Sequence, residues 1–259
     1  MDARALKRVL AVAANTFRET VRERVLYNLV FFAILMTLSG LLLGQLSIRQ
    51  DEKIIKDVGL AGMELFGTLI AIFIGVGLVS KEIERRSLYP LLAKPLGRGE
   101  FFLGKFLGLS FTLLVNVAFM TLGLYITLLA TGRPADPHLL NAVYPIFLGL
   151  LLVVALAMLF SSITSSALAS VFTVGMVLAG RYSDVIKNMR EVAPGAPAWL
   201  TQVLYFALPN FRNFDFKDRV AYGDPVSATA LGWVTLYAFV YVALALGVGL
   251  LSFRARDFQ

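Results

Sequence analysis

Long apolar runs alternate with charged stretches along this chain. A helix needs roughly 20 apolar residues to cross the hydrocarbon core of a bilayer. Runs that come close to this length, each predicting a transmembrane helix, are residues 28–47, 60–79, 106–130, 143–160, 163–180 and 231–253. The fifth run is rich in hydroxyl side chains, which favours close helix packing over the lining of a pore. The expected fold is an all-α integral membrane protein with six transmembrane helices, in a single domain over residues 1–259.

The first 27 residues follow a different pattern. At 100° per residue, their apolar and polar side chains fall on opposite faces of a helix. The apolar face holds Leu6, Val9, Leu10, Ala13, Phe17 and Val21, and the polar face holds Arg4, Lys7, Arg8, Asn15, Arg18, Glu19 and Arg22. A basic amphipathic helix of this kind lies in the membrane interface with its apolar side toward the lipid. Binding to a calmodulin-like partner is the alternative that the pattern favours less.

Composition supports the membrane assignment. The chain has 259 residues, of which 58% are hydrophobic and 16% are charged, whereas soluble domains contain about 25% charged residues. The net charge of +7 does not indicate a nucleic-acid partner, because half of the cations flank predicted spans and form no basic stripe with interleaved aromatics. The chain has no cysteine, which excludes disulfides and cysteine-ligated metals.

Lysines and arginines indicate the orientation, since short cytoplasmic flanks of membrane helices are enriched in them. One group precedes the first span: Arg4, Lys7, Arg8, Arg18, Arg22 and Arg24. A second group follows the second span: Lys81, Arg85, Arg86, Lys94, Arg98 and Lys105. The opposite side has fewer cations after the first and third spans: Arg49, Lys53, Lys56 and Arg133. We therefore expect both termini and the loop 81–105 to be cytoplasmic, in the inner (cytoplasmic) membrane of the cell.

The segment 181–230 is expected to lie on the outer side. Prolines and glycines divide it into short pieces. Within it, residues 198–208 are apolar but too few to cross the membrane. They predict an interfacial or re-entrant helix anchored by Trp199 and Tyr205.

Catalytic motifs are incomplete, so we expect no enzyme activity, no catalytic residue, no cofactor and no metal in this chain. Residues 99–105 match the spacing of a phosphate-binding loop, but Phe106 follows where a hydroxyl would hold Mg²⁺, and no buried strand precedes them. The only histidine, His138, stands in a loop with Pro134, Asp136 and Pro137 and is interpreted as a solvated turn residue. The chain is therefore not expected to hydrolyse ATP.

Glu64 is the sole acidic residue inside a predicted span. A carboxylate at the bilayer centre costs about 2.5–3.5 kcal/mol on insertion scales. Because Glu64 lies near the outer end of the predicted span, snorkelling to the interface is favoured over a cavity or proton site.

The loop 81–105 is unusually regular. Glu82 can pair with Arg85 or Arg86 one helical turn later, and a few apolar side chains follow it. Pro90 should end or kink this helix, and Glu100 suits the first turn of the next one. Gly104 and Gly108, like Gly40 and Gly44 in the first span, have the spacing that allows close helix contact, although glycine-rich spans often produce this spacing by chance. The pattern predicts a compact helix–turn–helix collar that can dock on a partner; a solvated loop with only orienting charges is the alternative.

The order of motifs in this loop resembles that of type-2 ABC export permeases, including the permease of the nitrous-oxide-reductase copper maturation system. The motifs are Lys-Glu-Ile-Glu-Arg-Arg-Ser-Leu at 81–88, Leu-Leu-Ala-Lys-Pro at 91–95, Arg-Gly-Glu-Phe at 98–101 and Gly-Lys-Phe-Leu-Gly at 104–108. The likeness extends to the amphipathic N-terminal helix, the six spans and the Leu-Pro-Asn-Phe motif at 208–211. Pro90 departs from the unbroken helix that is more usual in the family.

The resemblance implies a coupling helix in this loop that sits in a groove of a separate ABC ATPase subunit. The implied contact residues are Glu82, Glu84, Arg85, Arg86, Leu88, Leu91 and Leu92. It further implies a second permease copy, as a homodimer or a related heterodimer, with ATP and Mg bound by the ATPase. Transport would follow alternating access within surrounding membrane lipids. A non-transport scaffold or assembly subunit is the alternative function, and the substrate is not encoded in any recognisable motif.

Overall fold

The computed structural model describes residues 3–22, 31–32, 51–84, 97–134, 136–183 and 208–255. Over these ranges the chain forms helices joined by turns and no strand, which confirms the all-helical prediction there. Their bounds are α1 Ala3–Arg22, α3 Asp51–Glu84, α5 Arg98–Ala130, η1 Pro137–Leu139, α6 Leu140–Ile163, α7 Ser166–Arg181, η2 Phe211–Phe214, α11 Lys217–Ala221 and α12 Ala228–Ala255.

Four of the described helical stretches are long and apolar enough to cross a membrane: Glu52–Gly77, Arg98–Ala130, Pro137–Ile163 and Ala228–Phe253. They correspond to the second, third, fourth and sixth predicted spans. The fifth corresponds to α7, whose 16 residues are fewer than the roughly 20 that a perpendicular span needs. The first predicted span lies outside the described residues except for Phe31 and Phe32, which are helical. The count of six spans therefore stays a prediction.

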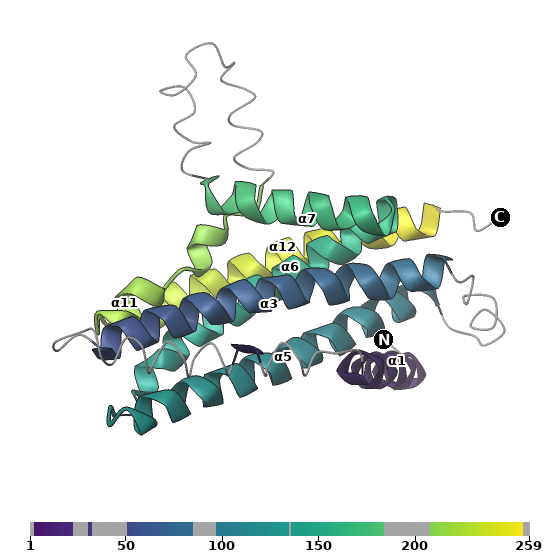
Figure 1. The fold of residues 1–259 in the computed structure, drawn as a ribbon. Helices are drawn as coiled ribbons and strands as arrows, with labels where there is room; N and C mark the ends of the chain where they lie inside the picture. The colour runs from purple at the N-terminus through teal and green to yellow at the C-terminus, as the bar shows by residue number, and fades with distance from the viewer. Residues whose placement is uncertain are drawn as a thin grey trace, which may run out of the picture.

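Helix α6 is the centre of the described bundle. In its apolar window 72% of residues are buried, compared with 28% in α12. It packs against α3, α5, α7 and α12, and Figure 1 shows these helices running side by side along one long axis. A helix that is apolar all around suits such a position, because neighbours cover each of its faces.

Helices α6 and α7 are joined by a sharp reversal at Thr164 and Ser165. Both residues have extended backbone conformations that cannot continue a helix. The Thr164 hydroxyl donates to the Phe160 carbonyl at 3.0 Å, which satisfies an acceptor at the end of α6. Helix α7 therefore returns along α6 (Figure 1).

Helix α1 crosses the beginning of α5 (Figure 1). The contact is close because α5 presents glycines there: a Cβ on Gly104 would meet Val12 at 2.7 Å, and one on Gly108 would meet the Ala13 carbonyl at 2.6 Å. Glycines spaced by one helical turn allow backbones to approach in this way. The face of α1 toward α5 buries Val9 and Thr16, whereas Leu6 and Leu10 stay exposed. The interfacial position of α1 in lipid remains a prediction.

The beginning of α5 also lies beside the end of α12. The rings of Phe101 and Phe253 stack with centroids 6.4 Å apart, and Phe102 and Phe253 are 5.9 Å apart. Helix α1, the beginning of α5 and the end of α12 therefore share one end of the molecule, here called the inner end. This grouping agrees with the orientation predicted from the cations.

At the opposite, outer end, residues 208–223 form a folded hairpin against the bundle. Phe211, Phe214 and Val220 are buried in the core. The Asn210 backbone N–H donates to the Tyr237 hydroxyl at 2.6 Å. This part of the predicted outer segment is therefore folded and packs against the helix bundle. The predicted interfacial or re-entrant helix 198–208 lies outside the described residues apart from its last position.

Candidate functional site

The implied ATPase contact falls largely outside the described residues. Of its members, Glu82 and Glu84 occupy the last turn of α3, while Arg85, Arg86, Leu88, Leu91 and Leu92 lie in the undescribed stretch 85–96. The structure therefore neither brings these residues together nor separates them. What it does describe is how the two flanking helices are anchored.

The described ends of α3 and α5 lie inside the predicted loop 81–105. Helix α3 continues to Glu84 and α5 begins at Arg98, so both ends of this segment are helical. The reason is local: Glu100 accepts a hydrogen bond from the Gly97 backbone N–H at 3.2 Å. A carboxylate in the first turn satisfies a free N–H and complements the helix dipole. The predicted role of Glu100 is confirmed.

Two charged contacts join this start of α5 to α1. The Arg8 guanidinium lies 2.7 Å from Glu100, so the residue that caps α5 also holds the amphipathic helix. Farther along α5, Lys105 is only 2% exposed and its Nζ lies 4.0 Å from Glu19. Helix α1 covers Lys105, which belongs to the predicted loop 81–105. The inner end is thus a joint of α1 and α5, next in the chain to the coupling segment that the resemblance implies.

Helix α3 links the inner end to the outer half of the molecule. It contains 34 residues without interruption, which corresponds to about 50 Å at 1.5 Å per residue. Its inner end leads directly into residues 85–96, and its outer half carries Glu64. A displacement at one end of a continuous helix is transmitted to the other end.

Glu64 is the centre of a charged cluster at the outer half. Its carboxylate contacts both the Arg181 guanidinium at the end of α7 and the Lys217 ammonium in α11. The Glu64 side chain is 16% exposed and that of Lys217 is 13% exposed. We name Glu64, Arg181, Lys217 and Asp215 the outer charge cluster, because Asp215 lies 3.6 Å from the Lys217 Nζ.

Snorkelling and a cavity or proton site both stay predictions for Glu64. Helix α3 begins at Asp51, so Glu64 stands more than three turns inside the helix. Its charge is compensated by two cations instead of by water. Arg181 could have been suspected from the sequence, as a cation at the end of the fifth apolar run. Lys217 could not, because only the folded hairpin brings it there.

Burial lowers the pKa of the Lys217 ammonium; Asp215 opposes this shift and Arg181 adds to it. Like charges close together disfavour protonation, and a carboxylate favours it. Lys217 is therefore a cation whose charge depends on its acidic neighbours, and this makes the cluster sensitive to the loss of either carboxylate.

Arg181 is held in place by a close contact between the end of α7 and the backbone at Pro209. A Cβ on Gly180 would meet the Pro209 carbonyl and the Phe211 ring, which it would contact at 2.8 Å. The Leu-Pro-Asn-Phe motif at 208–211 therefore lies directly against the end of α7. Asn210 stabilises this motif, since its side chain accepts from the Arg212 N–H at 2.9 Å.

A second ionic network joins the start of α3 to the turn before α6. The Lys56 Nζ lies 2.8 Å from Asp136 and 2.7 Å from Glu52, and Lys56 is 4% exposed. The Tyr125 hydroxyl donates to the Asp136 carbonyl at 3.0 Å. Burial by itself would raise the pKa of the Asp136 carboxyl, but hydrogen bonds from Lys56 and the His138 N–H outweigh it and lower that pKa. His138 itself is exposed in η1, as its interpretation as a turn residue requires.

The contacts among the described side chains are ion pairs, hydrogen bonds and apolar packing. Within these residues, no three His, Cys, Asp or Glu side chains gather closely enough to hold a metal ion. The two sites that remain as functional candidates are the α1–α5 joint beside the coupling segment and the outer charge cluster, with α3 running between them.

Comparison with known proteins identifies the relationship of the chain. The family described as "ABC-2 family transporter protein" matches residues 10–258, nearly the whole chain. No curated protein matches the chain.

Proposed function

The chain belongs to the ABC-2 transporter family, and from this we propose that it is the transmembrane subunit of an ATP-driven exporter that works by alternating access. Family membership implies a multi-pass membrane permease that pairs with an ABC ATPase. The proposal adds the direction of transport, the cycle, the coupling residues and a second permease copy. The closer likeness to the nitrous-oxide-reductase maturation permeases is not needed for it.

One observation carries the proposal: α3 connects the segment expected to meet the ATPase with the outer charge cluster. ATP-driven closure of two ATPase subunits would push on residues 85–96 of each permease. Because α3 is continuous, that push reaches Glu64, whose partners Arg181 and Lys217 belong to other elements. In one state the cluster is closed, as in this structure. In the other, α3 moves relative to α7 and α11, and the cluster opens.

Thermodynamic linkage makes this mechanism testable. If nucleotide on the ATPase and the state of the cluster bias the same equilibrium, each must affect the other by the same free energy. A change at Glu64 should therefore alter ATP hydrolysis by the partner, even though α3 separates the two sites by tens of ångströms.

The first experiment tests the coupling segment. The tagged chain is purified from its native membrane, and the co-purifying ATPase is quantified by mass spectrometry. The double variant Arg85→Glu with Leu88→Asp should lower the amount of co-purifying ATPase at least ten-fold. The control Arg133→Glu, just after the end of α5, should leave that amount unchanged. If the double variant retains both the ATPase and transport-coupled hydrolysis, this segment is not the joint. A wild-type complex without any ATPase favours the scaffold function instead.

Orientation is tested with single cysteines, which the cysteine-free chain makes unambiguous. An impermeant maleimide added to intact cells should label Thr131→Cys, an exposed position at the outer end. It should label Ser87→Cys only after the membrane is opened. Labelling of Ser87→Cys from outside would overturn both the orientation and the proposed ATPase contact.

A further inference from the structure

Helix α3 is held at two places in its outer half. Near its start, the Lys56 ammonium contacts Asp136 in the turn before α6. Farther along, the Glu64 carboxylate contacts the two cations of the outer charge cluster. At 1.5 Å per residue, about 12 Å of helix separates Lys56 from Glu64, and about 42 Å separates Lys56 from the inner end of α3. The two contacts differ in what supports them, and this difference decides how α3 can move.

The contact at Lys56 is supported from several directions. Lys56 is 4% exposed, and its Nζ lies 2.8 Å from the Asp136 carboxylate. That carboxylate also accepts from the His138 N–H at 2.9 Å. The Asp136 carbonyl accepts from the Tyr125 hydroxyl at 3.0 Å, which ties the turn to α5. A buried ion pair is costly to break, because each charge would be left without compensation.

Apolar packing around Lys56 acts in the same direction. Ile55 and Leu60 are fully buried. A Cβ on Gly59 would meet the Leu124 side chain of α5 at 2.5 Å, so the two helices touch closely here. Interlocked side chains of this kind resist sliding, because many of them would have to leave their places together. The start of α3 is therefore fixed by shape as well as by charge.

The contact at Glu64 is easier to exchange. The Arg181 side chain is 41% exposed, so water can replace the carboxylate there. The Lys217 Nζ lies 3.6 Å from Asp215 on the same hairpin, so Lys217 keeps an acidic neighbour when Glu64 moves away. The gap that forms admits water to Glu64. This contact can therefore open at a smaller cost than the contact at Lys56.

The outer hairpin, residues 208–223, is joined to the bundle through its first half. The Asn210 N–H donates to the Tyr237 hydroxyl of α12 at 2.6 Å. A Cβ on Gly149 of α6 would meet the Phe214 ring at 3.5 Å, an ordinary packing distance. These contacts hold the hairpin to α6 and α12 when α3 moves.

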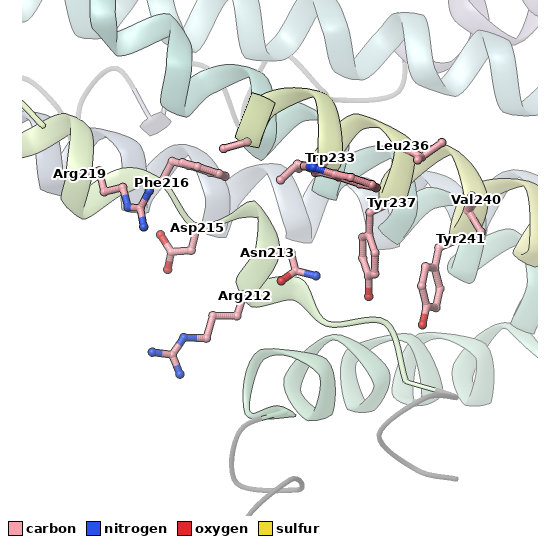
Figure 2. A pocket seen from close by; sticks show the side chains of 12 residues that line it. Arg212, Asn213, Asp215, Phe216, Arg219, Trp233, Leu236, Tyr237, Val240 and Tyr241 are labelled. Carbon is pink, nitrogen blue, oxygen red and sulfur yellow. The ribbon is translucent and has the colours of Figure 1, made fainter. Parts of the chain in front are cut away.

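A groove separates the second half of the hairpin from α12. Its volume is about 650 Å³. Asp215, Phe216 and Arg219 line it from the hairpin, and Trp233 lines it from α12 (Figure 2). Because the groove lies between them, α12 does not hold this half of the hairpin in place. Lys217 belongs to this half, which is a further reason why its contact with α3 can open.

We propose that Lys56 is the pivot of α3: the helix tilts about the Lys56–Asp136 contact and separates from Arg181 and Lys217 at Glu64. This inference rests on the proposed function, since it specifies how α3 responds to the ATPase. Lys56 is a positioning residue that acts on Glu64 through the helix. A displacement of about 10 Å at the inner end of α3 would move Glu64 by about 3 Å, which separates a hydrogen-bonded pair.

A pivot at Lys56 preserves another contact between α3 and the hairpin. The Lys53 Nζ lies 4.8 Å from the centre of the Tyr222 ring. Lys53 precedes Lys56 by only three residues, so a tilt moves it little, whereas sliding of α3 would move it as far as Glu64. The end of the hairpin therefore stays on α3 while Lys217 is released.

The test measures how far two positions on α3 move. Spin labels are attached to two pairs of introduced cysteines, Ala61→Cys with Phe239→Cys and Phe73→Cys with Leu251→Cys. All four positions are exposed, and the chain has no other cysteine. Each pair joins α3 to α12 at a similar number of residues from their outer ends. The labelled chain is diluted with unlabelled chain and combined with the ATPase. Double electron–electron resonance then gives the distances with and without ATP and vanadate.

Nucleotide should change the Phe73 distance about three-fold more than the Ala61 distance, because Phe73 follows Lys56 by 17 residues and Ala61 follows it by five. Equal changes at both positions would show that α3 moves as a whole. That result overturns the pivot but leaves the lever of the proposed function in place. No change at either position contradicts both.

Variants test whether the Lys56–Asp136 contact is the pivot. Lys56→Met with Asp136→Asn removes both charges together, so neither is left uncompensated. It should lower the three-fold ratio toward one, an effect that a merely stabilising contact would not have. The control Glu52→Gln removes the partner that moves with Lys56 on α3, so the ratio should stay near three-fold. An unchanged ratio in the double variant overturns the proposal. The wild-type ratio decides it if the double variant does not fold.

Discussion

The inner and outer ends of this protein are held together by different means. At the inner end, α1 lies on α5 because Gly104 and Gly108 let the backbones meet, and the Arg8–Glu100 pair beside this contact is partly exposed. At the outer end, α3, α7 and α11 meet through ionised side chains with Glu64 at the centre; Glu64 and Lys217 are largely buried and Arg181 is partly exposed. One joint depends on shape and the other on charge.

This difference suits the roles proposed for the two ends. Close packing between small residues has a single good arrangement, so α1 and α5 should move as one body when the ATPase pushes. A buried charge cluster is costly when it is broken but can exchange partners, so it can separate two states of a cycle. Rigid packing is therefore expected beside the ATPase, and switching between two states is expected at the outer end. Four changes test it, taken from the largest expected effect to the smallest.

Replacing Glu64 should have the largest effect. Glu64→Leu leaves Arg181 and Lys217 without the carboxylate between them, and breaking a buried pair costs about 3–5 kcal/mol. We expect the lower end of this range, because Arg181 is 41% exposed. The free energy of unfolding in mixed SDS micelles measures it.

The control for Glu64 is Glu52→Leu on the same helix. Its carboxylate is 34% exposed, and Lys56 keeps Asp136 as a partner when it is removed, so its loss should cost no more than about 1 kcal/mol. Adding Lys217→Leu to Glu64→Leu should restore part of the stability, since removing both charges leaves less to compensate. Equal losses for Glu64→Leu and Glu52→Leu would contradict the assignment of a buried cluster.

Overpacking of the inner joint should come next. In Gly108→Val the new side chain meets the Ala13 carbonyl and Thr16, and such insertions typically cost about 1–3 kcal/mol. Helix α1 should loosen from α5, which increases trypsin cleavage at the exposed Arg18. Gly123→Val on the same helix meets no atom within 4 Å and should leave the cleavage rate unchanged. Loosening by both variants would show that the glycine contact is not specific.

Acid should weaken the outer end at Asp136. Because the folded state lowers the pKa of this carboxyl, its contribution to stability is complete above the ordinary value of 3.8 and is lost as pH falls through the lower folded value. The melting temperature in detergent should therefore fall more steeply below pH 3.8 in the wild-type protein than in Asp136→Asn. Parallel curves for the two proteins would refute this contribution.

The smallest effect is expected at the Arg8–Glu100 pair. Its side chains are 37% and 21% exposed, and pairs of this kind contribute at most about 1 kcal/mol. Arg8→Gln should lower the free energy of unfolding by less than that amount, and 1 M salt should reduce the difference further. Arg18→Gln, exposed on the same helix, provides the control. A loss above about 2 kcal/mol would mean that charge also holds the inner joint.

Periodicity was a good guide to the helices and a poor guide to their ends. The apolar runs located α5, α6 and α12 to within a few residues at most boundaries, because a membrane helix must be long and apolar. Helix α3 begins at Asp51, nine residues before the predicted span starts at position 60. Lys56 and Asp57 interrupt the apolar run there, and the Lys56–Asp136 contact compensates one of these charges. Hydropathy alone does not register such pairing.

The candidate site was only partly predictable for a similar reason. The sequence indicated Glu64 because burying a carboxylate in an apolar run costs free energy. In the structure, two cations compensate this charge. The position of Glu64 near an interface stays a prediction. The sequence did not indicate a role for Gly180, because nothing near it in the chain predicts that the Pro209 carbonyl lies against it.

What the sequence determined by itself is the class of molecule: apolar runs of membrane length, an amphipathic first helix, and a charged segment between two spans that resembles an ABC permease loop. These properties follow from composition and short-range periodicity, both of which can be read from neighbouring residues in the chain. Only the tertiary structure decided that Glu64 meets Arg181 and Lys217, and that the hairpin faces α12 across a groove. Arg181 and Lys217 each lie more than a hundred residues from Glu64 in the chain, and only the packing of α3, α7 and α11 brings their charges within reach.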